Sequence, residues 1–259
     1  MNNTIPIKTE LPSWDLSDLY KSTQSRAINF DLRKLEKLTI NFNKKYKGKV
    51  HKLTDKKFYD LFNSLENIEK LSGRLISYSY LNYCENVSCE EKNKFLSNIQ
   101  EKLVKFESNM LFLSLEINSI SEKKFRKLIA KKSRVKRYET FFNKIRLYKP
   151  YQLSESMENL LNEYKSSSKS SWCKLFDETI SELSISISNK KYSFEESLNL
   201  LLSPNSKMRA TAGIKLSESL KEKIKLFSRI TNTLAKEKQI EDEKRNFSDP
   251  AASRHLANS

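Results

Sequence analysis

The stretch that decides the fold class is FLSNIQEKLVKFESNMLFLSLEI, residues 95–117. Its apolar side chains recur at intervals of four, four, three, four, three and four residues, which is the spacing of one face of an α-helix. Such a stripe can line a ligand pocket, but packing in a core is its more common role. We therefore predict one continuous, core-facing helix here. Its stripe consists of Phe95, Ile99, Leu103, Phe106, Met110, Leu113 and Ile117.

Similar stripes lie on both sides of this segment and predict further helices. The last of them is long and carries Leu216, Leu220, Ile224, Phe227, Ile230 and Leu234 on one side. Before the first helix, a leader without helical period is expected to be pinned to the body by Trp14, Leu16, Leu19 and Tyr20. The other predicted helices cover residues 28–46, 54–78, 137–147 and 154–164, with a short one after Ser121 and one through Leu198, Leu201 and Leu202.

One passage has the period of β-structure. Ile185 and Ile187 alternate with serines, and the sequence NKK offers a turn into Tyr192 and Phe194, which predicts a lone hairpin. The end of the sequence, DPAASRHLANS from Asp249, predicts the start of another helix, because Asp is a good N-cap and Pro suits the first helical turn. The predicted fold class is all-α, mainly helical, with one small β-hairpin.

Glycine is scarce, with three residues in 259, and there are five prolines. Phosphate-cradling loops need several closely spaced glycines, so that the backbone can approach the anion. The sequence therefore excludes a P-loop and a dinucleotide-binding fingerprint. Long helices with short polar connections are expected instead.

The chain is strongly basic, with 48 Lys and Arg against 32 Asp and Glu and a formal net charge of +16. This charge allows a nucleic-acid or anionic-membrane partner. It also allows a solvated exterior on which lysines and glutamates are interleaved. The densest run, KKFRKLIAKKSRVKRY at residues 123–138, has Leu128 and Ile129 at its centre and is typical of a helix face. We favour the solvated exterior and expect neither a membrane nor a nucleic-acid partner.

The N-terminal sequence MNNTIPIKTELPSWDL lacks the charged and apolar regions of a secretory signal, and no apolar run approaches the length of a membrane span. The cysteines, Cys84, Cys89 and Cys173, are odd in number and sparse. Free thiols in a reducing cytoplasm are the simplest interpretation. We expect a cytoplasmic chain.

Residues that carry catalysis or bind metal are few. His51 lies in a predicted turn and His255 near the end of the sequence, and neither belongs to an H-E-x-x-H pattern. Four residues separate Cys84 from Cys89, whereas the cysteines of structural zinc sites are more often separated by two residues. Such sites also need a second pair of ligands. Adjacent acids point to different sides of a helix. We therefore predict no catalytic, cofactor-binding or metal-binding residue in this chain. The pairs of adjacent acidic residues considered as candidates are Glu90 and Glu91, Glu195 and Glu196, and Glu241 and Asp242.

Several motifs are collinear with one known family. They are Trp14-Asp15-Leu16 with Leu19-Tyr20, Ser171-Trp172 with Leu175-Phe176-Asp177, and Asn232-Thr233-Leu234-Ala235 leading to Ser253-Arg254-His255-Leu256-Ala257-Asn258. With the segments around them, they resemble the N-terminal part of the oligoendopeptidase F branch of the thimet-oligopeptidase-like zinc metallopeptidases. The likeness runs through nearly the whole chain.

The resemblance implies a largely helical, bowl-like zinc enzyme whose deep channel admits short peptides. Zinc in that family is held by an H-E-x-x-H helix and a distal glutamate, and the motif glutamate activates the metal-bound water. This chain has no such motif, since HLANS at His255 lacks the required Glu and second His. We therefore expect an N-terminal helical region at 1–190, a truncated beginning of the peptidase domain at 191–259, and no zinc held by this chain alone.

Three functions remain open at this stage. The first is an N-terminal fragment of an oligoendopeptidase F-like enzyme that is inactive by itself. The second is one half of a split peptidase, completed by a separately encoded C-terminal chain that supplies the zinc. The third is a basic helical binding module, which rests on the net charge of +16.

Overall fold

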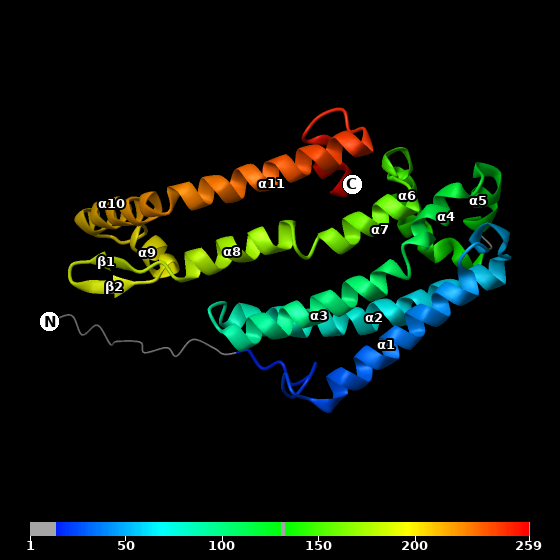
Figure 1. Ribbon diagram of the computed structural model, residues 1–259, viewed down its shortest axis with the longest axis horizontal. Coiled ribbons are helices and arrows are strands. Elements are labelled where there is room, and N and C mark those ends of the chain that lie inside the picture. Colours follow the sequence, from blue (N-terminus) through cyan, green and yellow to red (C-terminus); the bar gives the residue numbers. More distant parts are fainter. Residues whose placement is uncertain (1–13, 131–132, 259) are drawn as a thin grey trace.

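Helices stack in three tiers in the computed structural model, which describes residues 14–130 and 133–258. α1, α2 and α3 form one tier, α7 and α8 the next, and α10 and α11 the third (Figure 1). The hairpin lies at one end of the tiers and α4 to α6 lie at the other. The predicted fold class, all-α with one small hairpin, is confirmed.

The helices and strands have the following bounds. They are α1 (Arg26–Tyr46), η1 (Val50–Lys52), α2 (Asp55–Glu85), α3 (Glu90–Ser108), α4 (Phe112–Ser119), α5 (Glu122–Leu128), η2 (Arg134–Tyr138), α6 (Glu139–Leu147), η3 (Lys149–Tyr151), α7 (Glu155–Tyr164), α8 (Lys169–Ser181), β1 (Ile185–Ile187), β2 (Lys190–Tyr192), α9 (Phe194–Leu200), α10 (Ser206–Glu222), α11 (Ile224–Arg245) and α12 (Ala252–Ala257).

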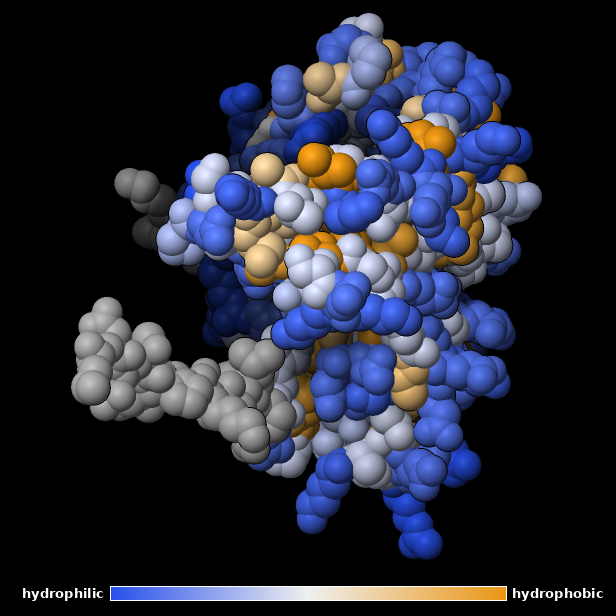
Figure 2. Space-filling view, turned by 90° about the vertical axis from the view of Figure 1, so that its left-hand side faces the viewer, coloured by the Kyte–Doolittle hydropathy of each residue, from blue (hydrophilic) through white to orange (hydrophobic). Residues whose placement is uncertain are grey.

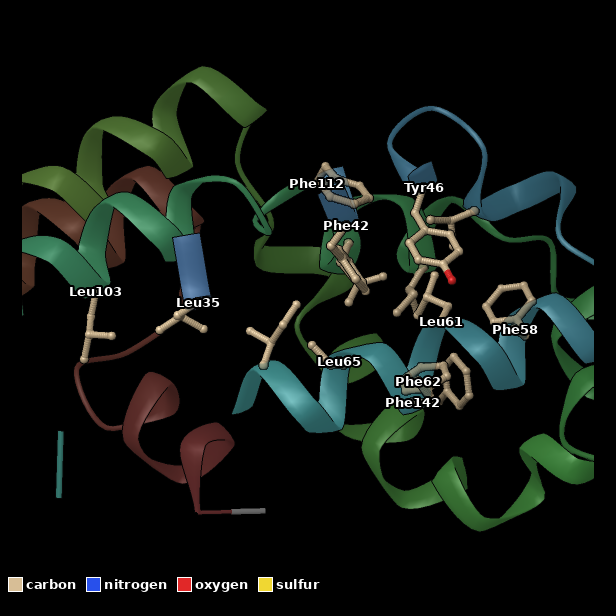
Figure 3. Packing of buried hydrophobic residues seen from close by; sticks show 14 of the residues in the cluster. Leu35, Phe42, Tyr46, Phe58, Leu61, Phe62, Leu65, Leu103, Phe112 and Phe142 are labelled. Atoms are coloured by element: carbon tan, nitrogen blue, oxygen red, sulfur yellow. The ribbon is translucent and has the colours of Figure 1, made fainter. Parts of the chain in front are cut away.

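The main hydrophobic core lies among α1, α2 and the helices from α3 to α6. Phe58, Phe62 and Phe142 are fully buried in it, and the rings of Phe62 and Phe142 meet edge to face with centroids 4.9 Å apart. Figure 3 shows these rings from α2 and α6 packed below Phe42 and Phe112. Edge-to-face pairs add to the stabilisation that comes from burial alone. The core therefore ties together elements that are distant in sequence.

The prediction of one continuous helix over 95–117 is wrong. α3 ends at Ser108 and α4 begins at Phe112. The break leaves the carbonyl of Asn109 outside a helical ladder, and the side-chain amide of Asn43 donates to it at 2.7 Å. This bond from α1 supplies the partner that a continuous helix would have given. The apolar stripe itself keeps its period across the break, so the sequence pattern did not reveal it.

The long helix predicted through 216–234 is also two helices. α10 ends at Glu222 and α11 begins at Ile224, with Lys223 between them at φ −100° and ψ 5°. α10 packs on α9 and β1, whereas α11 packs on α8. The two halves of the apolar stripe thus pack against different elements. Ile224, at the junction between them, is 56% exposed.

The leader is anchored as predicted except at its first residue. Tyr20 is buried, its hydroxyl donates to the Asp31 carboxylate at 2.8 Å, and Leu16 and Leu19 pack against the core. Trp14 was expected to be an anchor, but it is 59% exposed because no core element covers it. Residues 11–13 of the predicted leader lie outside the described part of the chain.

The predicted hairpin is present, and β1 and β2 pair antiparallel with Ile187 opposite Lys190. Its turn is formed by Ser188 and Asn189, both at positive φ, one position earlier than the NKK sequence suggested. Asn is among the residues that tolerate this backbone region best. The buried Ile185 and Ile187 belong to a second, smaller hydrophobic cluster with residues of α10. Figure 2 faces this end of the molecule and shows apolar side chains among mostly hydrophilic ones.

A helix does follow Asp249, but it begins at Ala252 and not at Pro250, which was predicted to be its first residue. The Asp249 carboxylate accepts hydrogen bonds from the amides of Ala251 and Ala252 at 2.8 and 3.0 Å, and α12 follows. A carboxylate in this position satisfies amides that the first helical turn leaves without partners. None of the helices in the described residues is both long enough and apolar enough to cross a membrane.

Candidate functional site

The histidines and cysteines singled out in the sequence belong to separate elements. His51 is exposed in η1, where its carbonyl accepts a bond from Lys124, and His255 lies in α12. Cys84, Cys89 and Cys173 are free thiols at the end of α2, before α3 and in α8. Among the residues that the structure describes, no three His, Cys, Asp or Glu side chains are grouped in a way that could hold a metal ion.

Two extensive concave surfaces lie on either side of α11. The α8–α11 groove, with a volume of about 890 Å3, is lined by residues of α7, α8 and α11. Apolar side chains form much of its lining, with cationic ones beside them. Two carboxylates, Glu237 and Glu241, also border it, so the groove suits a segment with an apolar face and charged flanks. The lining includes Met157, Leu161, Tyr164, Trp172, Ile240, Lys165, Arg229, Lys236 and Lys244.

The second concave surface, the α4–α11 groove, has a volume of about 930 Å3. It runs between α4 and η3 on one side and α11 and α12 on the other. Apolar, polar and charged side chains line it, and they include Leu115, Asn118, Tyr148, Gln152, Leu234, Lys238 and Arg254. Both grooves share Glu237 and Glu241 of α11, so this helix is the wall between them.

α11 is exposed for its length. Ile230 is its one buried residue among the 22 that it spans, whereas α2 buries nine of 31. Eight further residues of α11 are half-buried, among them Leu226, Phe227 and Leu234, and the Phe227 ring meets Phe176 of α8 with centroids 5.5 Å apart. Polar contacts near the C-terminal end add to this packing.

An ion pair fixes that end. Arg245 donates from both terminal nitrogens to the two carboxylate oxygens of Glu158 on α7, at 2.8 and 2.9 Å. It also donates to Glu241 at 2.8 Å and to the carbonyl of Tyr151 at 3.2 Å. The side chains of Arg245 and Glu158 are each 18% exposed. We call Arg245, Glu158, Glu241 and their contacts the α11 latch.

Burial and hydrogen bonding act in opposite directions on the latch carboxylate. Burial alone would raise the pKa of Glu158, but bonds from Arg245 and from the amide of Leu153, at 3.0 Å, hold that pKa below its ordinary value. The same pairing raises the pKa of Arg245. Both groups are therefore charged at neutral pH, and the pair is a bidentate, charge-assisted contact.

The chain turns directly after the latch. Asn246 lies in the left-handed region at φ 60°, and the Phe247 amide donates back to the carbonyl of Asp242 at 3.0 Å. The turn stacks Phe247 on Tyr151, with ring centroids 4.0 Å apart. Lys238 then donates to the Pro250 carbonyl at 2.7 Å. The segment from α11 to α12 is thus folded against η3 and α7.

The sequence did not reveal the latch. Glu158 and Arg245 are 87 positions apart, and Arg245 ends a run of charged residues, EDEKR, that predicts a solvated helix face. The sequence does show the pair within α11, because Glu241 precedes Arg245 by four positions, which places both on one face of the helix. Nothing in the pattern pointed to the partner on α7.

Comparison with known proteins identifies relatives of this architecture. A family model described as Oligopeptidase F matches residues 116–184. Oligopeptidase PepF of Bacillus subtilis (strain 168) is 27% identical over 168 residues, which are 62% of this chain and 24% of that protein. The crystal structure of oligoendopeptidase-F from Enterococcus faecium matches with a TM-score of 0.76 at 15% identity, over 88% of this chain and 45% of that one.

A further solved structure, from Chlamydophila abortus, matches with a TM-score of 0.53 at 14% identity over 93% of this chain and 41% of that one. At such identities the structural likeness shows the fold. The chain spans about a quarter of the length of the curated relative and less than half of the solved ones. The prediction that the chain resembles the N-terminal part of these proteins is confirmed.

Proposed function

Because this chain is similar to the N-terminal part of oligoendopeptidase F, we propose that it is the helical, non-catalytic portion of a peptidase that hydrolyses short peptides. In this proposal residues 1–259 do not hydrolyse peptides by themselves. The sequence has two histidines and no H-E-x-x-H motif, and the family's zinc requires that motif. The zinc and its activated water would be supplied by a segment that corresponds to the rest of the relatives' length.

The observation that carries the proposal is the exposure of α11 between two grooves. Ile240 of α11 is 48% exposed and lines the α8–α11 groove together with Trp172 of α8. Exposed apolar side chains along a groove are typical of a surface that another segment covers. More than half of the Enterococcus faecium structure has no counterpart in residues 1–259. We propose that this remainder covers α11, either further along one polypeptide or as a separately encoded chain.

The division at residue 190 is kept as part of the proposal. Residues 1–190 form the N-terminal helical region, and 191–259 form the beginning of the peptidase domain. The boundary passes through the hairpin, whose Ile185 and Ile187 pack with Leu216 of α10. The two parts would therefore move as one unit around that small cluster.

The first experiment measures zinc content and hydrolysis of short fluorogenic peptides by the purified chain, with Bacillus subtilis Oligopeptidase PepF treated in parallel. We expect no stoichiometric zinc and no hydrolysis by this chain. Zinc-dependent cleavage by residues 1–259 alone would overturn the proposal.

The second experiment adds a separately expressed segment that carries an H-E-x-x-H motif. We expect peptide hydrolysis to be restored if the segment covers α11. Ile240→Asp, inside the α8–α11 groove, should abolish the restoration, whereas Ile214→Asp on α10 should not, because Ile214 is 59% exposed and lies outside both grooves. If peptide hydrolysis is restored equally well with the Ile240→Asp variant, the interface does not lie on α11.

A further inference from the structure

Two basic segments that are far apart in sequence form one surface. Residues 49–57 and 122–137 together contain thirteen Lys and Arg but two Asp and Glu. They therefore carry +11 of the chain's formal net charge of +16. Most of the excess charge is concentrated in about a tenth of the sequence, although lysine as such is widespread.

Contacts join the two segments. Lys124 of α5 donates to the carbonyl of His51 in η1, and the hydroxyl of Ser133 donates to the Asp55 carboxylate at the start of α2 at 2.5 Å. Figure 1 places α5 at the end of the molecule opposite the hairpin. We call this surface, formed by residues 49–57, 122–130 and 133–137, the basic end.

Few of the charges at the basic end are neutralised. Among the described residues, three of its cations form ion pairs, Arg126 with Glu122, Lys136 with Glu139 and Arg137 with Glu66, and Glu122 also pairs with Arg146 of α6. Nearby acids are already engaged, since Asp55 binds Ser133 and Glu116 accepts from the amides of Gly48 and Val50. Among the described residues, eight cations here have no carboxylate partner within 4 Å. They are Lys49, Lys52, Lys56, Lys57, Lys123, Lys124, Lys127 and Arg134.

The side chains around these cations restrict the class of partner. Within the described parts of the two segments, no large apolar side chain is exposed. Stable attachment to a membrane needs a second signal besides basic charge, usually an inserted apolar group. Binding of single-stranded nucleic acid uses exposed aromatic platforms for base stacking. Duplex phosphates need only a cluster of cations.

We propose that the basic end binds the phosphate backbone of double-stranded nucleic acid without sequence preference. The proposal goes beyond the peptidase proposal and does not depend on it. If five of the eight cations contact phosphates, the slope of log K against log salt concentration is about −4.5. Affinity should then fall roughly 500-fold between 50 and 200 mM salt.

The test measures binding of a fluorescent 20-base-pair DNA duplex by anisotropy across that salt range. The test variant carries Lys56→Glu, Lys123→Glu and Lys127→Glu. The control carries Lys221→Glu, Lys223→Glu and Lys225→Glu, which make the same change in net charge at exposed positions around the junction of α10 and α11. Circular dichroism establishes that both variants are folded.

We expect wild-type and control chains to share the steep salt dependence. The test variant should lose about three phosphate contacts, so its affinity should fall by only about tenfold between 50 and 200 mM salt and should be weaker throughout. Absent binding at 50 mM salt, or an equal loss in the control, would overturn the proposal. Tighter binding to vesicles containing phosphatidylserine than to DNA at equal salt would assign the basic end to membranes instead.

Discussion

Replacing Glu158 by Gln tests whether the latch holds α11 in place. The substitution keeps the size of the side chain and removes its charge. It exchanges two charge-assisted bonds from Arg245, at 2.8 and 2.9 Å, for at most one neutral bond. Arg245 retains Glu241 at 2.8 Å, whose side chain is 43% exposed.

The geometry sets the size of the effect. Breaking a fully buried ion pair costs about 3–5 kcal/mol. Glu158 and Arg245 are 18% exposed, and one carboxylate remains beside the arginine, so a loss of about 2 kcal/mol is expected. Because Ile230 is the one buried residue of α11, the loss should act on local opening of this helix rather than on the main core. Two kcal/mol corresponds to about a 30-fold increase in the open population.

Hydrogen exchange followed by mass spectrometry measures that opening directly. Amides in residues 238–257 should exchange about 30-fold faster in Glu158→Gln, while amides of α2 should be unchanged. The matched control is Glu155→Gln on the same helix, which loses an exposed pair with Lys47 and should change exchange by less than about fivefold.

The pH dependence provides an independent check. The folded-state pKa of Glu158 is lowered, so its contribution is complete above the ordinary glutamate pKa of about 4.3 and is lost as the pH falls through the lowered value. Wild-type exchange in 238–257 should therefore approach that of Glu158→Gln in acid, after correction for intrinsic exchange rates. If the amides of residues 238–257 are equally protected in wild type and Glu158→Gln at pH 7, the latch does not hold α11. The same conclusion follows if Glu155→Gln speeds their exchange as much as Glu158→Gln does.

Two other substitutions test the core and a helix cap, each read as the free energy of unfolding from urea titration. Phe142→Ala should cost about 3–5 kcal/mol, because the ring is fully buried among Phe58 and Phe62; Phe141→Ala, at a 42% exposed position, should cost clearly less, and equal losses would contradict the packing. Ser193→Ala should cost about 1 kcal/mol, because it removes the capping box in which Ser193 and Glu196 exchange bonds at 3.1 and 2.8 Å; a change below about 0.3 kcal/mol would show that the box contributes little.

Periodicity predicted the elements that face the main core. The stripes on α1 and α2 are buried almost throughout, since a helix between two others must present apolar side chains at the helical period. The hairpin was predicted for a similar reason, because alternation with buried Ile185 and Ile187 is specific to a strand. These signals are local, so one sequence is sufficient to detect them.

The apolar periodicity did not predict where one helix ends and the next begins. At Asn109 and Lys223 the stripe continues, yet the chain ends one helix and begins another. The break at Asn109 is stabilised by a contact from α1, the side-chain amide of Asn43 on the Asn109 carbonyl. A bond between residues 66 positions apart leaves no trace in the hydrophobic pattern. The same holds for the latch and for the meeting of the two basic segments.

The exposure of α11 and the strength of its latch are connected. A helix buried on one side gains about 25 cal/mol for each Å2 of apolar surface removed from water, and α2 gains this along its whole length. α11 buries Ile230 fully, and its N-terminal half is held on α8 by contacts such as the Phe227 ring against Phe176, with centroids 5.5 Å apart. Its C-terminal end is held by the bidentate pair and by Phe247 stacked on Tyr151. A helix held in this way can keep its direction while the grooves on its flanks remain open to another segment. If such a segment covers both grooves, the α11 amides should gain protection along 224–237, where the latch alone gives them least.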